Sequence, residues 1–510
     1  MESSIKKIVI VGGGSAGWMA ASAFAKALDM SMYQIVLVES EKIKTVGVGE
    51  ATIPAIISFN SFLRVDEDTF VRETNGTFKL GIEFVNWGRE DGYYFHPYGL
   101  FGTDIGGFTF HHYYMRDHYR RGGPLELGKY NCETEAAQNG RFGRLKSDPG
   151  KPNLNYSYHF DAALYAVFLR KYAEQRGVRR EEGIISKVTQ HPENGYVKSV
   201  ILEDGREIEG DLFIDCSGFR GLLIEQTLQT GYHDWSHWLP VNRAAALQTE
   251  RPAGITPYTR ATAYEAGWQW RIPLQNRIGT GYVFCNTFIS EEEATEKFLT
   301  RLDGAPINQP WILRFTTGHR KQFWEKNVVA MGLAGGFLEP LESTSIHLIQ
   351  SSVFKFLAMF PRKGFNPLMV KEYNRQMAFE YSSIRDFIVA HYKITEREDT
   401  PFWKYVKYMD IPETLQERLD TFKATGQVLG IERELFRENS WYAVLGGQGL
   451  LPEDYHPAAD TMDEEELRMH LVRWRSIVLD RVRNLPSHED FILKHCASDE
   501  LKNLAALRVQ

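Results

Sequence analysis

The chain opens with two apolar runs separated by a glycine turn and an alanine-rich stretch. The runs are Ile8–Val11 and Gln34–Glu39; residues 12–17 form the turn, and residues 18–28 have a helical pattern. Strand, turn, helix and strand make a βαβ unit, which is typical of parallel nucleotide-binding sheets. The start of the chain therefore predicts an α/β fold.

The middle of the chain predicts more strands than helices. Residues 83–119 are dense in Gly, Tyr, Phe and His, and their weak helical periodicity predicts long loops with short strands. Residues 161–176 predict a helix, and residues 188–208 a hairpin that turns at Asp204-Gly205. Residues 244–288 alternate and hold many Thr, Tyr and Trp, so they predict antiparallel sheet.

Two further apolar runs end at glycines, and helices follow. Residues 211–217 run into Gly-Phe-Arg-Gly, and residues 328–331 into a glycine-rich turn and a helix near Ser345. From residue 351 onward helical patterns dominate, without repeats or an evident linker. We expect one compact body. Residues 1–350 would form a nucleotide-binding part interwoven with a sheet, and residues 351–510 a helical cap.

Composition places the chain among ordinary globular enzymes. Of 510 residues, 43% are hydrophobic and 25% charged, and 59 basic against 66 acidic residues leave a net charge of −7. This balance argues against a nucleic-acid partner or an anionic membrane surface. Aromatic residues make up 13%, which suits both a large core and a pocket for a flat ring.

The cysteines and the chain start bear on the compartment. Cys132, Cys216, Cys285 and Cys496 have no CxxC spacing, which argues against a zinc site or a disulfide framework, so we expect no metal. The first strand leaves no room for a signal peptide, and no apolar stretch approaches the roughly 20 residues of a membrane-spanning helix. We expect a cytoplasmic protein with no membrane partner.

The first turn matches a dinucleotide fingerprint. In GxGxxG the first glycine makes the turn, the second admits a pyrophosphate and the third allows close helix packing, while the helix start favours negative charge. Glu39 ends the next strand, where a carboxylate can bind a ribose. A glycine turn kept for packing alone would leave Glu39 unexplained. The predicted binding residues are Gly12, Gly14, Ser15, Ala16, Gly17 and Glu39.

Two later glycine turns favour FAD over NAD as the dinucleotide. Asp215-Cys-Ser-Gly218 and Gly332-Leu-Ala-Gly335 each follow an apolar strand. Each alone reads more simply as a buried strand that ends in a turn. Several such turns converging on one ligand suit a long FAD, and Gly335 joins the predicted cofactor residues.

Several motifs resemble those of the flavin-dependent tryptophan-halogenase family, over most of the chain. The family's motifs are WxWxIP, GVGEATxP, a segment with a catalytic lysine, PLEST and HPFG. In this chain they stand as Trp268–Pro273, Gly47–Pro54, Phe78–Gly81, Pro340–Thr344 and, with Tyr in place of Phe, His96–Gly99. The resemblance implies an FAD-binding monooxygenase-like α/β fold with a C-terminal helical substrate cap.

The resemblance also implies roles for individual residues. Lys79 and Glu342, with Ser343 beside the glutamate, would be catalytic, and Thr344 and Ser345 would hold the halide at a helix start. The flavin loop would contribute Gly49, Glu50 and Ala51, and the substrate pocket His96 and Tyr98. A lone lysine is normally a solvated surface residue, and a glutamate at a helix start can serve only the helix dipole.

The chemistry of halogenation gives these residues their tasks. Trp268 and Trp270 alternate on a predicted strand, so both face one side and can wall the flavin from the substrate. Without the other motifs, the core face of a sheet would be the better explanation of the pair. A buried Lys79 can act as an ammonium donor to hypohalous acid or form a haloamine, and both remain open. Glu342 can polarise the oxidant or take the ring proton.

Two departures from the family pattern bear on specificity. Ser345 replaces the usual glycine after PLEST, which a suitable backbone can tolerate, and we expect a bias toward bromide over chloride. The family's clamp for free tryptophan, a Tyr-Tyr pair and an acid, corresponds here to Trp441, Tyr442 and Gln448, without the acid. An indole or a larger indole-bearing molecule is therefore the expected substrate.

These observations predict a flavin-dependent halogenase, a brominase or chlorinase that uses FADH2, oxygen and halide. Only one dinucleotide fingerprint is present, so a separate flavin reductase would supply the FADH2. One rival is an aromatic hydroxylase (an FAD monooxygenase) of the same fold, which would need no halide. The other is a non-catalytic flavin-binding protein, which would dispense with Lys79 and Glu342.

Overall fold

A computed structural model of the chain describes residues 5–43, 49–362, 364–430 and 432–509. Two compact units, each assembled from three separate segments, make up the chain. Unit 1 holds residues 1–76, 160–237 and 315–382, and unit 2 holds residues 77–159, 238–314 and 383–510. Residue 350, where the sequence suggested a boundary, lies inside the continuous helix α8 (Ser345–Ala358) of unit 1.

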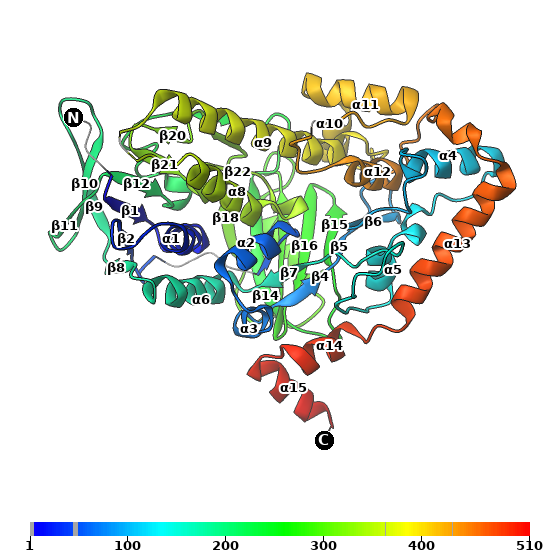
Figure 1. Ribbon diagram of the computed structural model, residues 1–510, viewed down its shortest axis with the longest axis horizontal. Coiled ribbons are helices and arrows are strands. Elements are labelled where there is room, and N and C mark those ends of the chain that lie inside the picture. The colour runs from blue at the N-terminus through cyan, green and yellow to red at the C-terminus, as the bar shows by residue number, and fades with distance from the viewer. Residues whose placement is uncertain (1–4, 44–48, 363, 431, 510) are drawn as a thin grey trace. The chain divides into compact units, whose positions relative to one another are not determined.

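A six-stranded sheet forms the centre of unit 1 (Figure 1). The predicted βαβ unit is confirmed: β1 (Lys7–Val11) and β2 (Gln34–Glu39) pair in parallel, and α1 (Ser15–Ala27) connects them. The sheet order is β20-β21-β12-β1-β2-β8; the remaining strands are β20 (Trp324–Glu325), β21 (Val328–Ala330), β12 (Leu212–Asp215) and β8 (Arg179–Glu182). Apolar side chains bury both faces of β1 and β2, as parallel strands require.

Smaller elements complete unit 1. The predicted hairpin is present, but its strands form a three-stranded antiparallel sheet: β9 (Ile185–Gln190), β10 (Val197–Leu202) and β11 (Glu207–Glu209). A second small sheet pairs β13 (Tyr232–Asp234), β19 (Gly318–Arg320) and β22 (Gly336–Phe337). The other elements are β3 (Glu50–Ala51), α2 (Ala55–Leu63), α3 (Glu67–Glu73), α6 (Ala162–Glu174) and the first part of α9 (Pro367–Lys393).

Unit 2 is built on a seven-stranded sheet in the order β18-β14-β17-β16-β15-β5-β6. The predicted antiparallel region is confirmed as β14 (Arg243–Glu250), β15 (Thr259–Tyr264), β16 (Gly267–Pro273) and β17 (Arg277–Phe284). β18 (Trp311–Arg314), β5 (Gly81–Val85) and β6 (Tyr93–Pro97) complete it, and only the β15–β5 pair is parallel. β4 (Thr77–Lys79) pairs separately with β7 (Ser157–Phe160).

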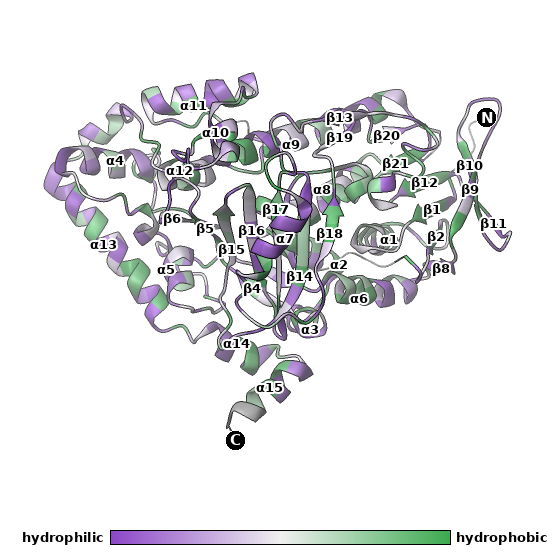
Figure 2. Ribbon diagram, turned by 180° about the vertical axis from the view of Figure 1, so that it is seen from behind, coloured by the Kyte–Doolittle hydropathy of each residue, from purple (hydrophilic) through white to green (hydrophobic). Residues whose placement is uncertain are grey.

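Helices make up most of the other regular structure of unit 2, and those after residue 400 agree with the helical pattern predicted for the C-terminal part of the chain. The helices are α5 (Cys132–Gln138), α7 (Glu291–Leu299), α10 (Pro401–Tyr408), α11 (Glu413–Thr425), α12 (Glu438–Gly447), α13 (Glu464–Arg483), α14 (His488–His495) and α15 (Asp499–Val509). Along α13, hydrophilic and hydrophobic residues alternate (Figure 2), and its buried stripe runs from Leu467 to Val482. Such a stripe is what an amphipathic helix presents to a core.

Three helices of unit 2, α4 (Phe110–Arg121), α5 and α7, were not predicted, and α4 departs most clearly from the expectation. α4 occupies residues that we expected to form loops and short strands. Seven consecutive residues, Phe110–Arg116, are buried, so the apolar and polar positions lack the one-sided period of a surface helix. Because α4 is buried on several sides, its sequence lacks the one-sided apolar periodicity from which a helix can be predicted.

Candidate functional site

Each of the three fingerprint glycines of unit 1 is needed for a different structural reason. Gly12 has a φ of 111°, and a Cβ there would lie 2.2 Å from the Cys216 carbonyl oxygen. A Cβ on Gly17 would lie 1.8 Å from the Gly12 carbonyl oxygen, so this glycine allows α1 to pack closely. A Cβ on Gly14 would meet nothing within 4 Å. Gly14 thus leaves room at the start of α1, where a pyrophosphate fits.

Glu39 ends β2 in unit 1 and is mostly buried. Its Oε2 accepts a hydrogen bond from Trp18 Nε1 at 3.3 Å, and its Oε1 accepts one from Arg180 Nε at 2.5 Å. The carboxylate is therefore oriented by its neighbours at the carboxyl end of a parallel strand. That position is the usual one for an acid that binds a ribose.

Both later glycine turns approach the fingerprint. The Cys216 carbonyl contacts the Gly12 position, and a Cβ on Gly332 would lie 2.8 Å from the Ala16 Cβ. The Asp215 carboxylate accepts from the backbone N–H groups of Leu223 and Ile224 and so serves the turn itself. Gly335 follows the short helix η3 (Gly332–Ala334) and has an ordinary φ of −81°. The predicted convergence of three turns is present in unit 1, and it suits an extended dinucleotide.

The flavin-loop motif is only partly within the described residues. Gly47 and Val48 lie outside them, whereas Glu50 and Ala51 form β3. Burial, together with the nearby charge of Asp161, raises the pKa of Glu50 to about 7. A carboxyl group of this kind exchanges protons near neutral pH.

The PLEST segment forms a tight turn before α8. Glu342 ends the short helix η4 (Pro340–Glu342) and is buried, and Ser343 has a left-handed φ of 58°. Thr344 is the N-cap of α8, but its hydroxyl makes no capping hydrogen bond. Ser345 is the first residue of the helix, so the serine in place of glycine needs no left-handed backbone.

Lys79 of unit 2 is completely buried on β4. Its Nζ lies 5.4 Å from the centre of the Tyr98 ring, within cation–π range. Ser157, which stands opposite Lys79 in the β4–β7 pair, donates a hydrogen bond to the Tyr98 hydroxyl at 3.2 Å. The structure thus brings two predicted residues together, and Ser157 is a neighbour that the sequence did not reveal.

A neutral histidine lies beside Lys79. Burial, then the charge of Lys79, holds the pKa of His159 well below its usual value. Its Nδ1 lies 2.9 Å from Thr77 Oγ1, whose own proton goes to the Pro273 carbonyl, and its Nε2 lies 2.8 Å from Thr259 Oγ1. Nδ1 therefore carries the proton and Nε2 accepts. Both nitrogens are used, which makes His159 a structural support for β4.

The WxWxIP motif forms β16, as predicted. Trp268 and Trp270 are both buried, with ring centres 6.3 Å apart. A Cβ on Gly281, opposite Trp270, would lie 2.3 Å from its indole, so this glycine makes room for the ring. Trp268 also packs at 6.4 Å from Trp87. One indole thus belongs to an aromatic core cluster, and the role of the pair as a wall stays a prediction.

Two phenylalanines connect the predicted substrate residues His96 and Trp441. Phe387 and Phe436 stack with ring centres 4.0 Å apart. His96 lies 5.6 Å from Phe387 and 6.0 Å from Phe436, and Trp441 lies 4.9 Å from Phe387. The sequence gave no signal for either phenylalanine, because residues 96, 387, 436 and 441 come from distant segments.

A buried ion pair rests on Trp441. The Arg418 guanidinium lies 4.6 Å from the centre of the indole and donates to both carboxylate oxygens of Glu434, at 2.8 and 2.9 Å. Glu453 and Asp454, the acids that follow the motif in sequence, are exposed. Glu434 is thus connected to Trp441 through Arg418, which already balances its charge. A second acid, Glu438, lies one turn before Trp441 on α12.

Tyr442 points to a different neighbour. Its ring stacks on His111 of α4 with ring centres 3.8 Å apart and an angle of 4° between planes. Burial and the nearby His112 lower the pKa of His111 to about 3, so His111 is neutral. Gln448 donates to the Tyr94 hydroxyl and to the His391 carbonyl. Tyr442 and Gln448, which the resemblance places at the substrate clamp, thus both contact other residues in the core of unit 2.

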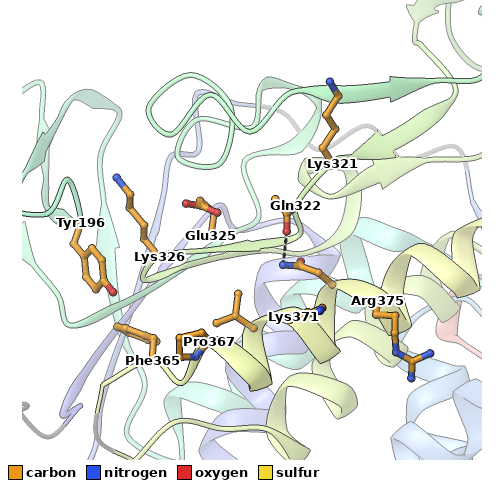
Figure 3. Close-up of a pocket in the computed structure, with 11 residues that line it drawn as sticks. Tyr196, Lys321, Gln322, Glu325, Lys326, Phe365, Pro367, Lys371 and Arg375 are labelled. Carbon is orange, nitrogen blue, oxygen red and sulfur yellow. Dashed lines mark hydrogen bonds between the residues drawn. The ribbon is translucent and has the colours of Figure 1, made fainter.

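A surface cavity of about 580 Å³ lies elsewhere on unit 1 (Figure 3). Its walls include Lys321, Lys326 and Lys371, and the amides of Gln322 and Asn374 bond to each other across it. None of the predicted site residues lines this cavity. Within the described ranges there is no cluster of His, Cys, Asp and Glu that could hold a metal ion, and no helix long and apolar enough to span a membrane.

Known proteins similar to this chain agree with the motifs. The family model for tryptophan halogenase matches residues 7–464. The chain belongs to the tryptophan halogenase family. Tryptophan 7-halogenase RebH of Lentzea aerocolonigenes is 36% identical, over 96% of this chain and 99% of its own length.

Solved structures lead to the same family. The flavin-dependent halogenase Xcc4156 of Xanthomonas campestris has a TM-score of 0.94 and 45% identity, over 97% of this chain and 99% of its own. BrvH of Brevundimonas sp. BAL3, also a flavin-dependent halogenase, has a TM-score of 0.91 and 41% identity, over 96% and 99%. The α/β fold predicted from the resemblance is confirmed.

Membership of the tryptophan halogenase family defines the class of the enzyme. The chain is an FAD-dependent halogenase, an oxidoreductase of a family that uses reduced FAD and halide. Flavin-dependent halogenases rely on a separate flavin reductase for the reduced cofactor. The aromatic hydroxylase and the non-catalytic flavin-binding protein are not favoured.

Proposed function

We propose that the enzyme brominates an indole-type aromatic ring and that Lys79 presents the halogen of hypohalous acid to the ring. The observation that carries this proposal is the complete burial of Lys79 on β4, beside the ring of Tyr98. A lysine without a chemical task normally stays solvated. Inside unit 2 its nitrogen is shielded from water, which would otherwise compete for a reactive oxidant.

Residues of unit 1 fit the cofactor. Gly14, Ser15 and Ala16 would present backbone N–H groups to the pyrophosphate, and Glu39 would bind a ribose. Gly12 and Gly17 shape the turn, and Gly49, Glu50, Ala51 and Gly335 would contact other parts of the flavin nucleotide. When bound, reduced FAD supplies hypohalous acid from oxygen and halide.

The halide would bind at the first turn of α8. Thr344 is fully buried, and its Oγ1 has no hydrogen-bond partner among the described residues. With no side chain capping the helix, the amides of Thr344 and Ser345 remain available to an anion at the positive end of the helix. We propose bromide as the preferred halide, because Ser345 replaces the family's glycine here.

The chemical step itself needs only substitution and proton transfer. Hypohalous acid and the ring react as Ar–H + HOX → Ar–X + H2O. If the Lys79 ammonium holds hypohalous acid by a hydrogen bond, the ring electrons attack the halogen, the O–X bond breaks, and the lysine proton goes to the oxygen, which leaves as water. If the Lys79 amine forms a haloamine, water leaves when the N–X bond forms, and the later attack of the ring breaks N–X and returns the amine. Glu342, with Ser343 beside it, would take the proton that the ring carbon loses.

The substrate would be an indole rather than free tryptophan. His96, Trp441, Phe387 and Phe436 supply aromatic surface for a flat ring, and Tyr98 adds a polar group beside Lys79. RebH is a tryptophan 7-halogenase. Here Glu434, whose Arg418 partner packs on Trp441, is neutralised by that arginine, which supports a substrate without an ammonium group.

The test is a coupled assay with FAD and a flavin reductase. Indole is supplied with bromide, with chloride or without halide, and the products are identified by mass spectrometry. We expect bromoindole as the main product and less chloroindole. An oxygenated indole formed without halide would instead support the hydroxylase. The absence of any halogenated product from a panel of indoles would refute the proposed substrate class.

A further inference from the structure

A buried carboxylate joins α8 to α9 within unit 1. Glu380 of α9 contacts three side chains that follow one another by single turns of α8: His347, Ser351 and Lys355. His347 Nε2 lies 2.9 Å from Glu380 Oε1, and Ser351 Oγ donates to Oε2 at 2.5 Å. Lys355 Nζ also donates to Oε2. These contacts form a continuous cluster that begins in the first turn of α8.

Glu380 is ionised, and this determines the proton on His347. Burial alone would raise the pKa of Glu380, but the hydrogen bonds and charges of His347 and Lys355 outweigh burial and lower it to about 2. An ionised carboxylate only accepts hydrogen bonds. His347 Nε2 therefore donates to Glu380, which orients the imidazole and leaves Nδ1 as its remaining polar atom.

Several buried polar atoms at the start of α8, His347 Nδ1 among them, have no hydrogen-bond partner within the described residues. Among the described residues, His347 Nδ1, Thr344 Oγ1 and both amide atoms of Gln350 are buried without a hydrogen-bond partner. Thr344 and Gln350 are almost fully buried. All three residues belong to the first two turns of α8, counting its N-cap. Since buried polar groups are normally satisfied, this concentration points to a ligand.

Charge identifies the kind of ligand as an anion. The α8 start is the positive end of a 14-residue helix, and its N-cap hydroxyl does not close it. Within the cluster, Lys355 balances Glu380, so a doubly protonated His347 leaves one net positive charge. Thr344 and His347 are three residues apart and share a face of the helix. A monovalent anion at this face would meet an Nδ1–H donor and a matching charge.

We propose that His347 binds the halide through Nδ1, beside the amides of Thr344 and Ser345, and that Glu380 is the positioning residue that orients its ring. This inference deepens the proposed function and rests on it. The imidazole must carry both protons, because an unprotonated Nδ1 would turn a lone pair toward the halide. Glu380 holds the Nε2 proton through a charge-assisted hydrogen bond of 2.9 Å, and the halide supplies the balancing charge.

The first test compares bromide dependence in His347→Phe and in the wild type, with indole as substrate and a flavin reductase. Phenylalanine keeps a ring of similar shape but removes both nitrogens. We expect the KM for bromide to rise about tenfold or more, as the loss of a hydrogen bond to a charged group predicts. The kcat at saturating bromide, the KM for indole and the FAD affinity should stay unchanged.

Ser351→Ala is the matched control. It removes a hydrogen bond from the same helix to the same carboxylate, yet it leaves the imidazole and every charge in place. We expect it to lower the thermal unfolding temperature without changing the KM for bromide. Equal increases of that KM in Ser351→Ala and His347→Phe would overturn the proposal and would mean that the cluster only stabilises the packing of α8 against α9.

A second measurement does not depend on turnover or on a variant that folds. Crystals of the wild-type holoenzyme soaked in bromide should show an anomalous bromine peak within hydrogen-bond distance of His347 Nδ1. A bromide peak elsewhere, or an unchanged KM for bromide in a folded His347→Phe, would overturn the inference alone. A wild type that brominates no indole would instead refute the proposed function.

Discussion

The fingerprint turn of unit 1 and the aromatic region of unit 2 are built from different parts of the polypeptide. The turn uses backbone: Gly12, Gly14 and Gly17 stand within six consecutive residues, and each has its own steric reason. The aromatic region uses side chains from α9, α11, α12 and β6, which converge only after folding. A backbone site is local in sequence, whereas a side-chain site depends on tertiary packing.

The same difference separates what the two regions tolerate. A backbone site accepts most side chains that point away from it but fails at single glycines. A side-chain site can lose one ring and repack, yet it changes its selectivity when one charge is left without a partner. Variants in the fingerprint turn should therefore lose cofactor affinity, whereas variants in the aromatic region should change the rate of halogenation or the choice of substrate.

The largest expected effect is on Lys79 of unit 2. Lys79→Ala should lower the rate of halogenation by about 1,000-fold or more, because directed donation by a buried group is removed. The FAD affinity and the rate of oxygen consumption should stay unchanged, since the lysine acts only after hypohalous acid has formed. Product formation by mass spectrometry and oxygen uptake are measured on the same sample.

An exposed lysine of unit 2 provides the control for this change. Lys129 is paired with Glu126 at the surface, so Lys129→Ala should halogenate like the wild type. Near-normal halogenation by Lys79→Ala, or the loss of its FAD binding, would show that the role assigned to Lys79 is wrong.

The next effect contrasts two glycines of the same turn. Gly14→Val should fold normally, because its Cβ position is open, but lose about 100-fold in FAD affinity as the side chain fills the space for the pyrophosphate. Gly17→Ala should instead destabilise the fold by about 1–3 kcal/mol, because its Cβ would collide with the Gly12 carbonyl. Flavin titration and thermal unfolding distinguish the two. A folded Gly14→Val protein with wild-type affinity would contradict the placement of the pyrophosphate.

The contrast also explains how far the sequence alone could lead. β1, α1 and β2 were predicted closely, because their apolar residues follow a regular local pattern and glycines mark the turn between β1 and α1. α4 was missed, because burial on several sides erased its period. The motif residues Lys79, Tyr98, Trp268 and Trp270 were found through resemblance, and the structure adds their burial and spacing.

The supports of the site could not be predicted from the sequence. Glu434 stands 16 residues from Arg418, and Glu380 stands 33 residues from His347. Neither spacing matches a local motif, because loops and packed helices bring the partners together. Residue types alone would have ranked these groups with dozens of ordinary surface charges, and only burial and distance separate them.

The smallest effect concerns the substrate that the aromatic region selects. Under identical bromide and reductase conditions, indole should be turned over with a kcat/KM about tenfold or more above that of free tryptophan, because an unpaired buried ammonium costs several kcal/mol. Glu434 is connected to Trp441 through Arg418, which already occupies both of its oxygens. The ammonium of tryptophan would therefore find this carboxylate already paired.

Arg418→Met sharpens this last comparison because it frees Glu434 while keeping an apolar chain against Trp441. If the ion pair sets the preference, the variant should gain activity on tryptamine, which carries an ammonium and no carboxylate, relative to indole. Glu465 and Arg468 form an ion pair on the exposed face of α13, so Arg468→Met should leave the ratio unchanged. A wild type that prefers tryptophan to indole would mean that another acid pairs the ammonium. Glu453 and Asp454 would then be the first to replace, because both are exposed near the end of α12 in sequence.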